Sequence, residues 1–441
     1  MKAFLALPLL AFALPTAAMA APDDAVTQGR LEADIARLVA FGTRHTLSVQ
    51  DDPKRGIGAA RRWAEAEFRK TGAACGGCLE IVLPEAMVQG ERVPAPTRLV
   101  DVVAIQRGTE RPNEVVIVQG HIDSRNSDPL DAKGDAPGAN DDGSGTALVL
   151  EAARVLSKQK FAGTIVYAVL SGEEQGLYGG KLLADYAKAQ GWTVKAVLNN
   201  DIVGNSRGSD GLTDDAHVRV FSEGPRADAS SVRLDAQRAI GGENDSPSRN
   251  LSRWLAGLGD TGLAVRQVWR ADRMGRGGDH LPFQEAGYPA VRFTVAVENY
   301  ERQHQNVRTE SGRPFGDTVE AMDFAYLAKV TKLNVRALAA LAGAPMPPAA
   351  KVTAAVQTFT DVDWASLAGA ARYRLWQRRT DAPGWEAKPI AETSETHVRL
   401  EGVRGDDWFF GVSALAADGA ESPIASAVPG GDYRPEAAGK R

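Results

Sequence analysis

The sequence predicts a largely parallel β-sheet covered by helices, followed by a small antiparallel β-sandwich. Up to about residue 342, apolar runs of strand length alternate with stretches of helical period, which is typical of a parallel sheet. A Gly- and Pro-rich stretch, Gly343-Ala-Pro-Met-Pro-Pro348, then interrupts the pattern. Beyond it, short alternating runs are separated by turn clusters such as Ala417-Asp-Gly-Ala420, which is typical of an antiparallel sandwich.

The first twenty residues are predicted to be a signal peptide that is removed on export. Lys2 supplies the positive start, Ala3 to Leu14 form a short apolar core, and Ala18-Met-Ala20 fits the small-x-small cleavage rule. This core is too short to anchor in a bilayer, and no later run reaches ~18 apolar residues. We therefore expect an exported protein, periplasmic or secreted, with no membrane span. The expected domains are 1–20 signal peptide, 21–342 α/β domain, 343–350 linker, 351–430 sandwich and 431–441 tail.

Composition and charge bound the function. The chain has 441 residues, 44% of them hydrophobic and 24% charged, as in an ordinary globular protein. A formal charge of −5 argues against a nucleic acid partner, which requires a concentrated basic face. Cys75 and Cys78 are the only cysteines. No second Cys-x-x-Cys pair completes a zinc site, so in an exported protein a local disulfide is favoured over a redox centre.

Hydrophobic periodicity gives the order of elements in the α/β domain. Asp317, with Glu320 three residues on, is interpreted as the cap of a long helix. The expected helices are 32–41, 58–70, about 145–156, 178–189, 248–258 and 317–341, and the expected strands are 79–83, 99–106, 114–119, 164–170, 194–198, 218–222 and 289–297. The expected sandwich strands are 351–359, 373–378, 396–400 and 408–415.

Polar residues with metal-binding chemistry follow successive strands of the predicted sheet. Ligands collect where the strands of such a sheet end. Carboxylate oxygens and imidazole nitrogens bind zinc in hydrolases, and five ligands with one shared carboxylate can hold two metals and leave a position for water. The candidate residues are His121, Asp123, Asp141, Glu173, Glu174, Asp201 and His304.

Each of these features alone has an ordinary explanation. A Glu-Glu pair is usually solvated, a His-x-Asp is more often a hydrogen-bonded turn, and Asn-Asp-Asp-Gly is a turn signal. Their joint occurrence at strand ends favours the metal site. Neighbouring side chains at a strand end point in different directions, so one residue of Glu173-Glu174 can bind metal while the other faces the substrate and moves a proton.

The motifs resemble those of the di-zinc exopeptidases of the secreted bacterial aminopeptidase and glutamate carboxypeptidase kind. The resemblance spans roughly residues 30 to 342 and implies a mixed, mostly parallel sheet and two zinc ions. The motifs that carry it are His121-Ile-Asp-Ser, Pro137-Gly-Ala-Asn-Asp-Asp-Gly-Ser-Gly, Ser171-Gly-Glu-Glu-Gln-Gly-Leu-Tyr-Gly-Gly, Asn199-Asn-Asp-Ile-Val-Gly and the late His304.

The resemblance also implies a role for each candidate. Asp141 would bridge the metals and be followed by a cis peptide bond to Asp142. His121 and Asp201 would complete one metal site, Glu174 and His304 the other, while Glu173 would be the general base and Asp123 would orient His121.

The segment around His304 departs from this pattern. His304 is preceded by Arg302-Gln, whereas many members have an aromatic residue before it and Thr after it; Tyr300 is a candidate hydroxyl donor. Asp279 and His280 are expected to play a structural or supporting role.

The C-terminal pattern, with Trp364 and Tyr373-Arg-Leu-Trp, resembles a fibronectin type III domain.

The expected function is hydrolysis of N-terminal residues from peptides by a metal-activated bridging water. A carboxypeptidase would need a basic pocket, for which Arg207, Arg273 and Arg276 are candidates. A glutaminyl cyclase, which shares many of these motif positions, and a catalytically silent binding protein also stay open at this point. The expected partners are peptide substrates, and the sandwich is a candidate surface for contact with another protein.

Overall fold

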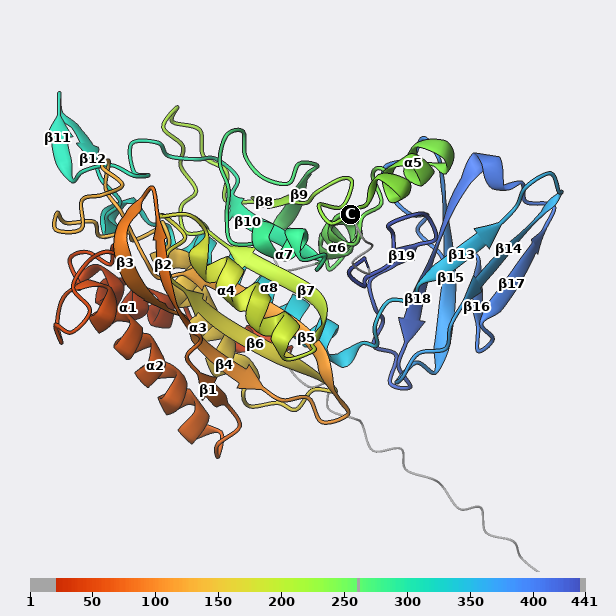
Figure 1. Ribbon diagram of the computed structural model, residues 1–441, viewed down its shortest axis with the longest axis horizontal. Coiled ribbons are helices and arrows are strands. Elements are labelled where there is room, and N and C mark those ends of the chain that lie inside the picture. Colours follow the sequence, from red (N-terminus) through yellow and green to blue (C-terminus); the bar gives the residue numbers. More distant parts are fainter. Residues whose placement is uncertain (1–20, 260–261, 437–441) are drawn as a thin grey trace, which may run out of the picture.

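The computed structural model describes residues 21–259 and 262–436 and confirms the α/β fold (Figure 1). The predicted signal peptide lies outside these residues. Within them, eight strands form one sheet in the order β1-β4-β6-β5-β7-β10-β8-β9. The strands are β1 Glu80–Val82, β4 Val102–Gln106, β5 Arg111–His121, β6 Gly163–Leu170, β7 Thr193–Asn200, β8 His217–Phe221, β9 Ala264–Val268 and β10 Ala290–Val295.

The sheet is mixed, with a parallel centre. Strands β6, β5, β7 and β10 run parallel to their neighbours within this group, and β8 and β9 are parallel to each other. The junctions β1–β4, β4–β6 and β10–β8 are antiparallel. Because the central strands are buried on both faces, they consist of almost continuous apolar runs, which made them predictable from sequence.

Helices cover both faces of this sheet (Figure 1). Val116 and Val118 of β5 face a core shared with α1, α2, α3, α6 and α8, whereas Val115 and Ile117 face a second core with α4 and α7. This alternation follows from the two-residue period of a strand. The helices are α1 Gln28–Val39, α2 Gly56–Ala74, α3 Gly143–Leu156, α4 Tyr178–Ala189, α5 Ser231–Ile240, α6 Pro247–Ala256, α7 Leu281–Glu285 and α8 Phe324–Gly343.

The start of the long helix differs from the prediction. Helix α8 begins at Phe324, and Asp323 caps it by accepting a hydrogen bond from the Tyr326 N–H. Asp317 is instead turned toward the loop before α3, where its carboxylate accepts hydrogen bonds from the main chain. The prediction was wrong because a buried tertiary contact uses the carboxylate that the sequence pattern assigned to the cap.

The expected strand 99–106 is also divided. Asp101 separates β3 (Val93–Val100) from β4, since its buried carboxylate accepts a hydrogen bond from the Ser171 N–H. β3 pairs with β2 (Glu85–Gly90) in a hairpin that the sequence analysis did not predict. Both strands of this hairpin are largely exposed, so they lack the apolar run that marks a buried strand.

The C-terminal region forms two antiparallel sheets, as predicted. One has the order β13-β14-β17 and the other β16-β15-β18-β19, and Trp364, Leu375 and Phe410 contribute to their common core. The expected strand 351–359 is divided between β13 and β14 by a turn. The resemblance to a fibronectin type III domain stays a prediction. The strands are β13 Ala350–Thr353, β14 Phe359–Trp364, β15 Arg372–Arg379, β16 Ala391–Thr393, β17 His397–Glu401, β18 Trp408–Leu415 and β19 Ala425–Ser426.

A two-stranded hairpin joins β11 (Arg308–Glu310) to β12 (Arg313–Phe315). Cys75 and Cys78 form a disulfide bond, which confirms that prediction. Of the predicted tail, residues 431–436 are hydrogen-bonded to Arg226 and Asp228 of the α/β domain, and Tyr433 is buried. Among the described residues, no helix is long and apolar enough to cross a membrane.

Candidate metal centre

The candidate residues meet at the carboxyl edge of the parallel strands. β5 ends at His121, β6 ends just before Glu173 and Glu174, and β7 ends just before Asp201. Asp141 comes from the loop before α3, and its peptide bond to Asp142 is cis, as the resemblance implied. Adjacent parallel strands end at the same edge, so residues distant in sequence converge there.

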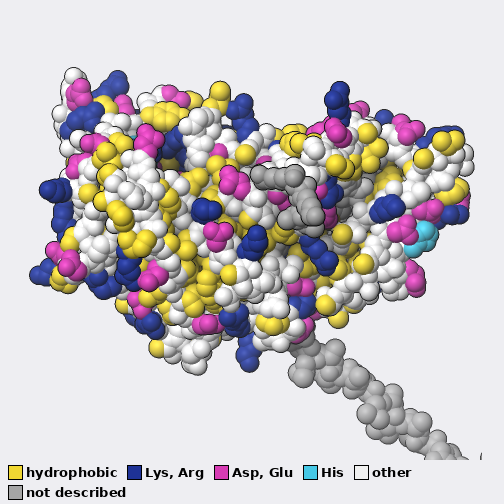
Figure 2. Space-filling view, viewed as in Figure 1, with side chains coloured by type: hydrophobic (Ala, Val, Ile, Leu, Met, Phe, Trp, Pro, Cys, Tyr) yellow, Lys and Arg dark blue, Asp and Glu magenta, His cyan; other side chains and the backbone are white. Residues whose placement is uncertain are grey.

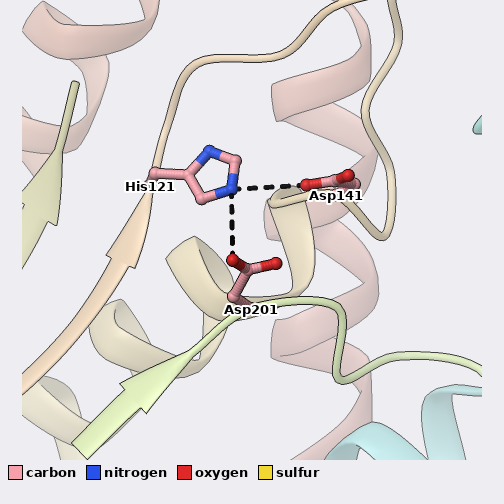
Figure 3. Close-up of side chains that lie close together, drawn as sticks. All are labelled: His121, Asp141 and Asp201. Carbon is pink, nitrogen blue, oxygen red and sulfur yellow. Dashed lines mark ion pairs between the residues drawn. The ribbon is translucent and has the colours of Figure 1, made fainter. Parts of the chain in front are cut away.

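His121, Asp141 and Asp201 form one group of potential ligands (Figure 3). Nε2 of His121 lies 3.3 Å from an oxygen of Asp141 and 3.8 Å from an oxygen of Asp201. One ligand atom from each residue fits within a span of 4.8 Å. All three side chains are buried, and Figure 3 shows both carboxylates turned toward the imidazole nitrogen.

Asp141, Glu174 and His304 form the second group. Nε2 of His304 lies 3.0 Å from the other oxygen of Asp141 and 3.1 Å from an oxygen of Glu174. Asp141 therefore faces both groups, one with each carboxylate oxygen. His304 has a backbone φ of +50°, a conformation uncommon outside glycine, so its ring is directed by an unusual main-chain path.

Glu173 lies beside these groups. Its side chain is 12% exposed, and one oxygen is 3.9 Å from Nε2 of His121. Burial raises the pKa of Glu173 well above its ordinary value; the charge of His121 opposes this shift, and that of Asp201 adds to it. A carboxyl group whose pKa is raised in this way can hold a proton near neutral pH.

Asp123 contacts His121 mainly through its main chain. Nδ1 of His121 forms a hydrogen bond of 3.1 Å with the Asp123 carbonyl oxygen, while the nearer carboxylate oxygen is 3.6 Å away. That carboxylate accepts hydrogen bonds from the N–H groups of Glu173 and Glu174. Asp123 thus ties the end of β5 to the loop after β6, while its carbonyl oxygen bonds the imidazole.

The chemistry of this cluster suits divalent cations. Four carboxylates, those of Asp141, Glu173, Glu174 and Asp201, converge in a largely buried place, where unpaired negative charge is costly. Within the described residues, Nε2 of His121 is buried and forms no hydrogen bond. Imidazole and carboxylate are the ligand types that zinc accepts, so the residues present fit two metal sites joined by Asp141.

Two further aspartates position the loop that carries Asp141. The Asp317 carboxylate accepts hydrogen bonds from the N–H groups of Asn140, at 2.9 Å, and Asp141, at 2.7 Å. The Asp142 carboxylate caps α3 through the Gly145 N–H and also accepts the His121 N–H. These contacts fix the loop relative to the strand ends. Burial raises the pKa of Asp317 to about 7, and its main-chain hydrogen bonds oppose that shift.

Two arginines that the sequence analysis missed contact the candidate ligands. Arg292 of β10 is fully buried and lies 2.7 Å from a carboxylate oxygen of Asp201. Arg125 donates to Glu174 at 2.9 Å and to Nδ1 of His304 at 2.7 Å. The sequence could have indicated that Arg292 has a buried acidic partner, since a lone arginine in an otherwise apolar strand must find one. Arg125 lies in a loop and carries no such signal.

A cavity of about 330 Å³ opens over the cluster. Its walls include Arg92, Arg125, Arg273 and Arg276, together with Leu177 and the four carboxylates. Arg273 and Arg276 thus line the cavity, whereas Arg207 does not.

Tyr300 and the pair Asp279-His280 lie outside this lining. Tyr300 is 64% exposed and is not among the residues that line the cavity. Asp279 accepts a hydrogen bond from the Gly180 N–H, and a ring nitrogen of His280 bonds the Ala271 carbonyl. Both residues are buried, in agreement with the supporting role expected for them.

Comparisons with known proteins agree with this geometry. A family model described as Peptidase family M28 matches residues 101–322. A probable zinc metalloprotease of Leptosphaeria maculans is 41% identical over 415 residues, 92% of this chain and 95% of that protein. One of Pyricularia oryzae is 42% identical over 434 residues, 95% of this chain and 86% of that protein. These relatives are fungal, so the bacterial and secreted part of the resemblance stays a prediction.

Solved structures share the fold. The Legionella pneumophila LapA aminopeptidase superposes with a TM-score of 0.52 at 20% identity, over 73% of this chain and 74% of that one. A leucine aminopeptidase precursor of Bacteroides thetaiotaomicron gives a TM-score of 0.50 at 14% identity, over 71% and 97%. At such identities the likeness extends to the architecture alone.

Proposed function

This chain belongs to Peptidase family M28 and is a zinc metallopeptidase, and on that premise we propose that it is an aminopeptidase acting through two zinc ions. The observation that carries the proposal is the placement of Asp141, whose two oxygens face separate groups of ligands. The fold shared with the LapA aminopeptidase supports the choice of aminopeptidase.

In this proposal each ligand group holds one ion. His121 and Asp201 would hold the first, Glu174 and His304 the second, and Asp141 would contribute to both. Zinc supplies Lewis acidity, which polarises a carbonyl oxygen and makes water acidic near neutral pH. Arg292 and Arg125 fix the carboxylates of Asp201 and Glu174, so these ligands need little reorganisation.

The proposed reaction uses Glu173 to move one proton. Its carboxylate borders the cavity beside both ligand groups, within reach of water and of a scissile bond placed there. Glu173 takes the proton of the attacking water and gives it to the departing amine, so that the carboxylate is regenerated after each turnover. The Asp123 carboxylate accepts a hydrogen bond from the main-chain N–H of Glu173 and so keeps Glu173 in place.

Replacing Glu173 tests this assignment. Glu173→Gln keeps the shape but removes the proton acceptor, so we expect kcat to fall about 10²- to 10⁴-fold while zinc content stays at the wild-type level. Glu285→Gln, on the exposed end of α7, is the matched control and should retain both. Kinetics and elemental analysis measure the two quantities. Activity of Glu173→Gln close to that of the control would refute the base assignment.

Substrate panels test the class of enzyme. We expect peptides with a free N-terminus to be hydrolysed and the same peptides with an acetylated N-terminus to resist. A chelator should abolish hydrolysis, and two equivalents of zinc should restore it. Indifference to the chelator would contradict the whole proposal, whereas release of C-terminal residues from acetylated peptides would replace aminopeptidase by carboxypeptidase.

We also propose that the protein is exported, periplasmic or secreted. The support is the pattern of residues 1–20, with Lys2 before an apolar core and Ala18-Met-Ala20 at its end. Expression of the full chain with sequencing of the mature N-terminus tests this. A mature protein that begins at Ala21 is expected, and an intact N-terminus would contradict it.

A further inference from the structure

The cavity over the metal centre is lined by several arginines, and we propose that it binds a carboxylate group of the peptide substrate through Arg92 and Arg276. This inference rests on the proposed peptidase function and names its substrate class. Within the described residues, Arg92, Arg125, Arg273 and Arg276 line the cavity, and its lining carboxylates are those of the metal centre.

Two of these arginines are already engaged by the protein. Arg125 donates to Glu174 and to His304. Arg273, 8% exposed, pairs with Asp272 at 3.2 Å and with Glu298 at 3.4 Å, and donates to the Gly277 carbonyl. Their guanidinium groups serve to hold the metal-centre residues and the loop around Gly277 in place.

Arg92 differs because it lacks an acidic partner. It lies in the turn between β2 and β3, is exposed, and donates one hydrogen bond, at 3.1 Å, to the main-chain oxygen of Glu174. Over residues 21–259 and 262–436 it forms no ion pair with a carboxylate. A guanidinium carries five N–H donors, so most of those of Arg92 are unused by the protein.

Arg276 has free donors as well. Its NH1 donates to Glu298 at 3.3 Å and to Gln303 at 2.8 Å, whereas Nε and NH2 form no hydrogen bond within the described residues. Glu298 also pairs with Arg219 and Arg273, so a single carboxylate is shared by three guanidinium groups. The Arg276 side chain is 29% exposed and therefore accessible from the cavity.

The balance of charge in the cavity points to an anionic ligand. Zinc ions at the centre would offset the four lining carboxylates, and the positive charge of Arg92 and Arg276 would remain. On the face shown in Figure 2, Lys and Arg are interspersed with Asp and Glu, so that face of the molecule is not generally basic. A planar guanidinium matches a carboxylate with two parallel hydrogen bonds.

This carboxylate can come from two parts of a peptide. It can be the side chain of an N-terminal Glu or Asp, or the terminal α-carboxylate of a short peptide. The first source is compared in Glu-Ala-Ala-amide and Gln-Ala-Ala-amide, which differ only in charge and have no α-carboxylate. The second is compared in Ala-Ala and Ala-Ala-amide.

The test measures kcat/KM of the zinc-loaded protein for both pairs. We expect the carboxylate member of one pair to be preferred about tenfold or more, and the preferred pair identifies the source. In Arg92→Gln and Arg276→Gln this ratio should shrink toward one, mainly through KM, and Arg276→Lys should restore part of it. Arg372→Gln, exposed in the sandwich, is the control and should keep the wild-type ratio.

Calorimetric binding of the same peptides to zinc-loaded Glu173→Gln protein gives the comparison without turnover. Equal kcat/KM values and equal binding affinities for both members of each pair would overturn the inference even if the peptides are hydrolysed. A ratio that survives in both arginine variants would do the same. A protein that binds the carboxylate peptide selectively but hydrolyses nothing would instead refute the proposed function.

Discussion

At the residue scale, the position of the Asp141 carboxylate depends on groups that do not themselves face both ligand sets. Asp141 is placed by Asp317, which accepts its N–H and that of Asn140. Asp142 joins the same loop to α3 and to β5. Such supporting contacts set the direction of a metal ligand and its affinity for the ion.

Replacing Asp317 tests this support. Asp317→Asn keeps the size, but its amide group turns an N–H donor toward main-chain N–H groups that need an acceptor. We expect zinc affinity to fall about 10- to 100-fold, measured by competition with a chromophoric chelator. Asp185→Asn, on the exposed face of α4, is the control. If both variants bind zinc as the wild type does, Asp317 does not position Asp141.

At the element scale, what could be predicted from the sequence follows from burial. β5, β6 and β7 are apolar runs, so their ends, and with them His121 and Asp201, could be located without a structure. Exposed strands such as β2 and β11 have no such run and were missed. Asp317 was misinterpreted because its partner lies more than 170 residues away, beyond any local pattern.

Glu223 is a buried carboxyl group that lies just after the end of β8. Its main-chain oxygen accepts from Ser246 beside α6, and its carboxylate accepts from the Ala227 N–H. Burial raises the pKa of Glu223 to about 7, against the effect of that hydrogen bond. The folded state therefore binds the proton more tightly than the unfolded state, so this group's contribution to stability is full below about pH 4.5 and lost as the pH rises through 7.

Glu223→Gln removes this titration while keeping an oxygen acceptor for Ala227. We expect the free energy of unfolding to fall less between pH 5 and pH 8 in the variant than in the wild type, by on the order of 2 kcal/mol. Urea denaturation at the two pH values measures the difference. Glu285→Gln should behave as the wild type, and an unchanged pH dependence in Glu223→Gln would contradict the prediction.

At the scale of the whole molecule, the sandwich is joined to the α/β domain through buried charge. Asp245, before α6, is 1% exposed and pairs with Arg378 of β15 at 2.5 Å and with Arg253 of α6 at 3.5 Å. Ser426 of β19 donates to the same carboxylate. Arg226, between β8 and α5, donates to the main-chain oxygens of Asp432 and Arg434, which follow the sandwich in the chain. These contacts tie both parts into one packed unit, which indicates that they unfold together.

Asp245→Ala tests that coupling. The change leaves Arg378 and Arg253 buried without their shared carboxylate, which is expected to cost about 3–5 kcal/mol. Because the loss falls at the junction, we expect one calorimetric transition in the wild type and two in the variant, with the sandwich unfolding at the lower temperature. Asp363→Ala breaks an exposed pair with His397 in the sandwich and should cost less than about 1 kcal/mol. One transition in Asp245→Ala, at the temperature of that control, would mean that the apolar contacts of the junction are sufficient without the ion cluster.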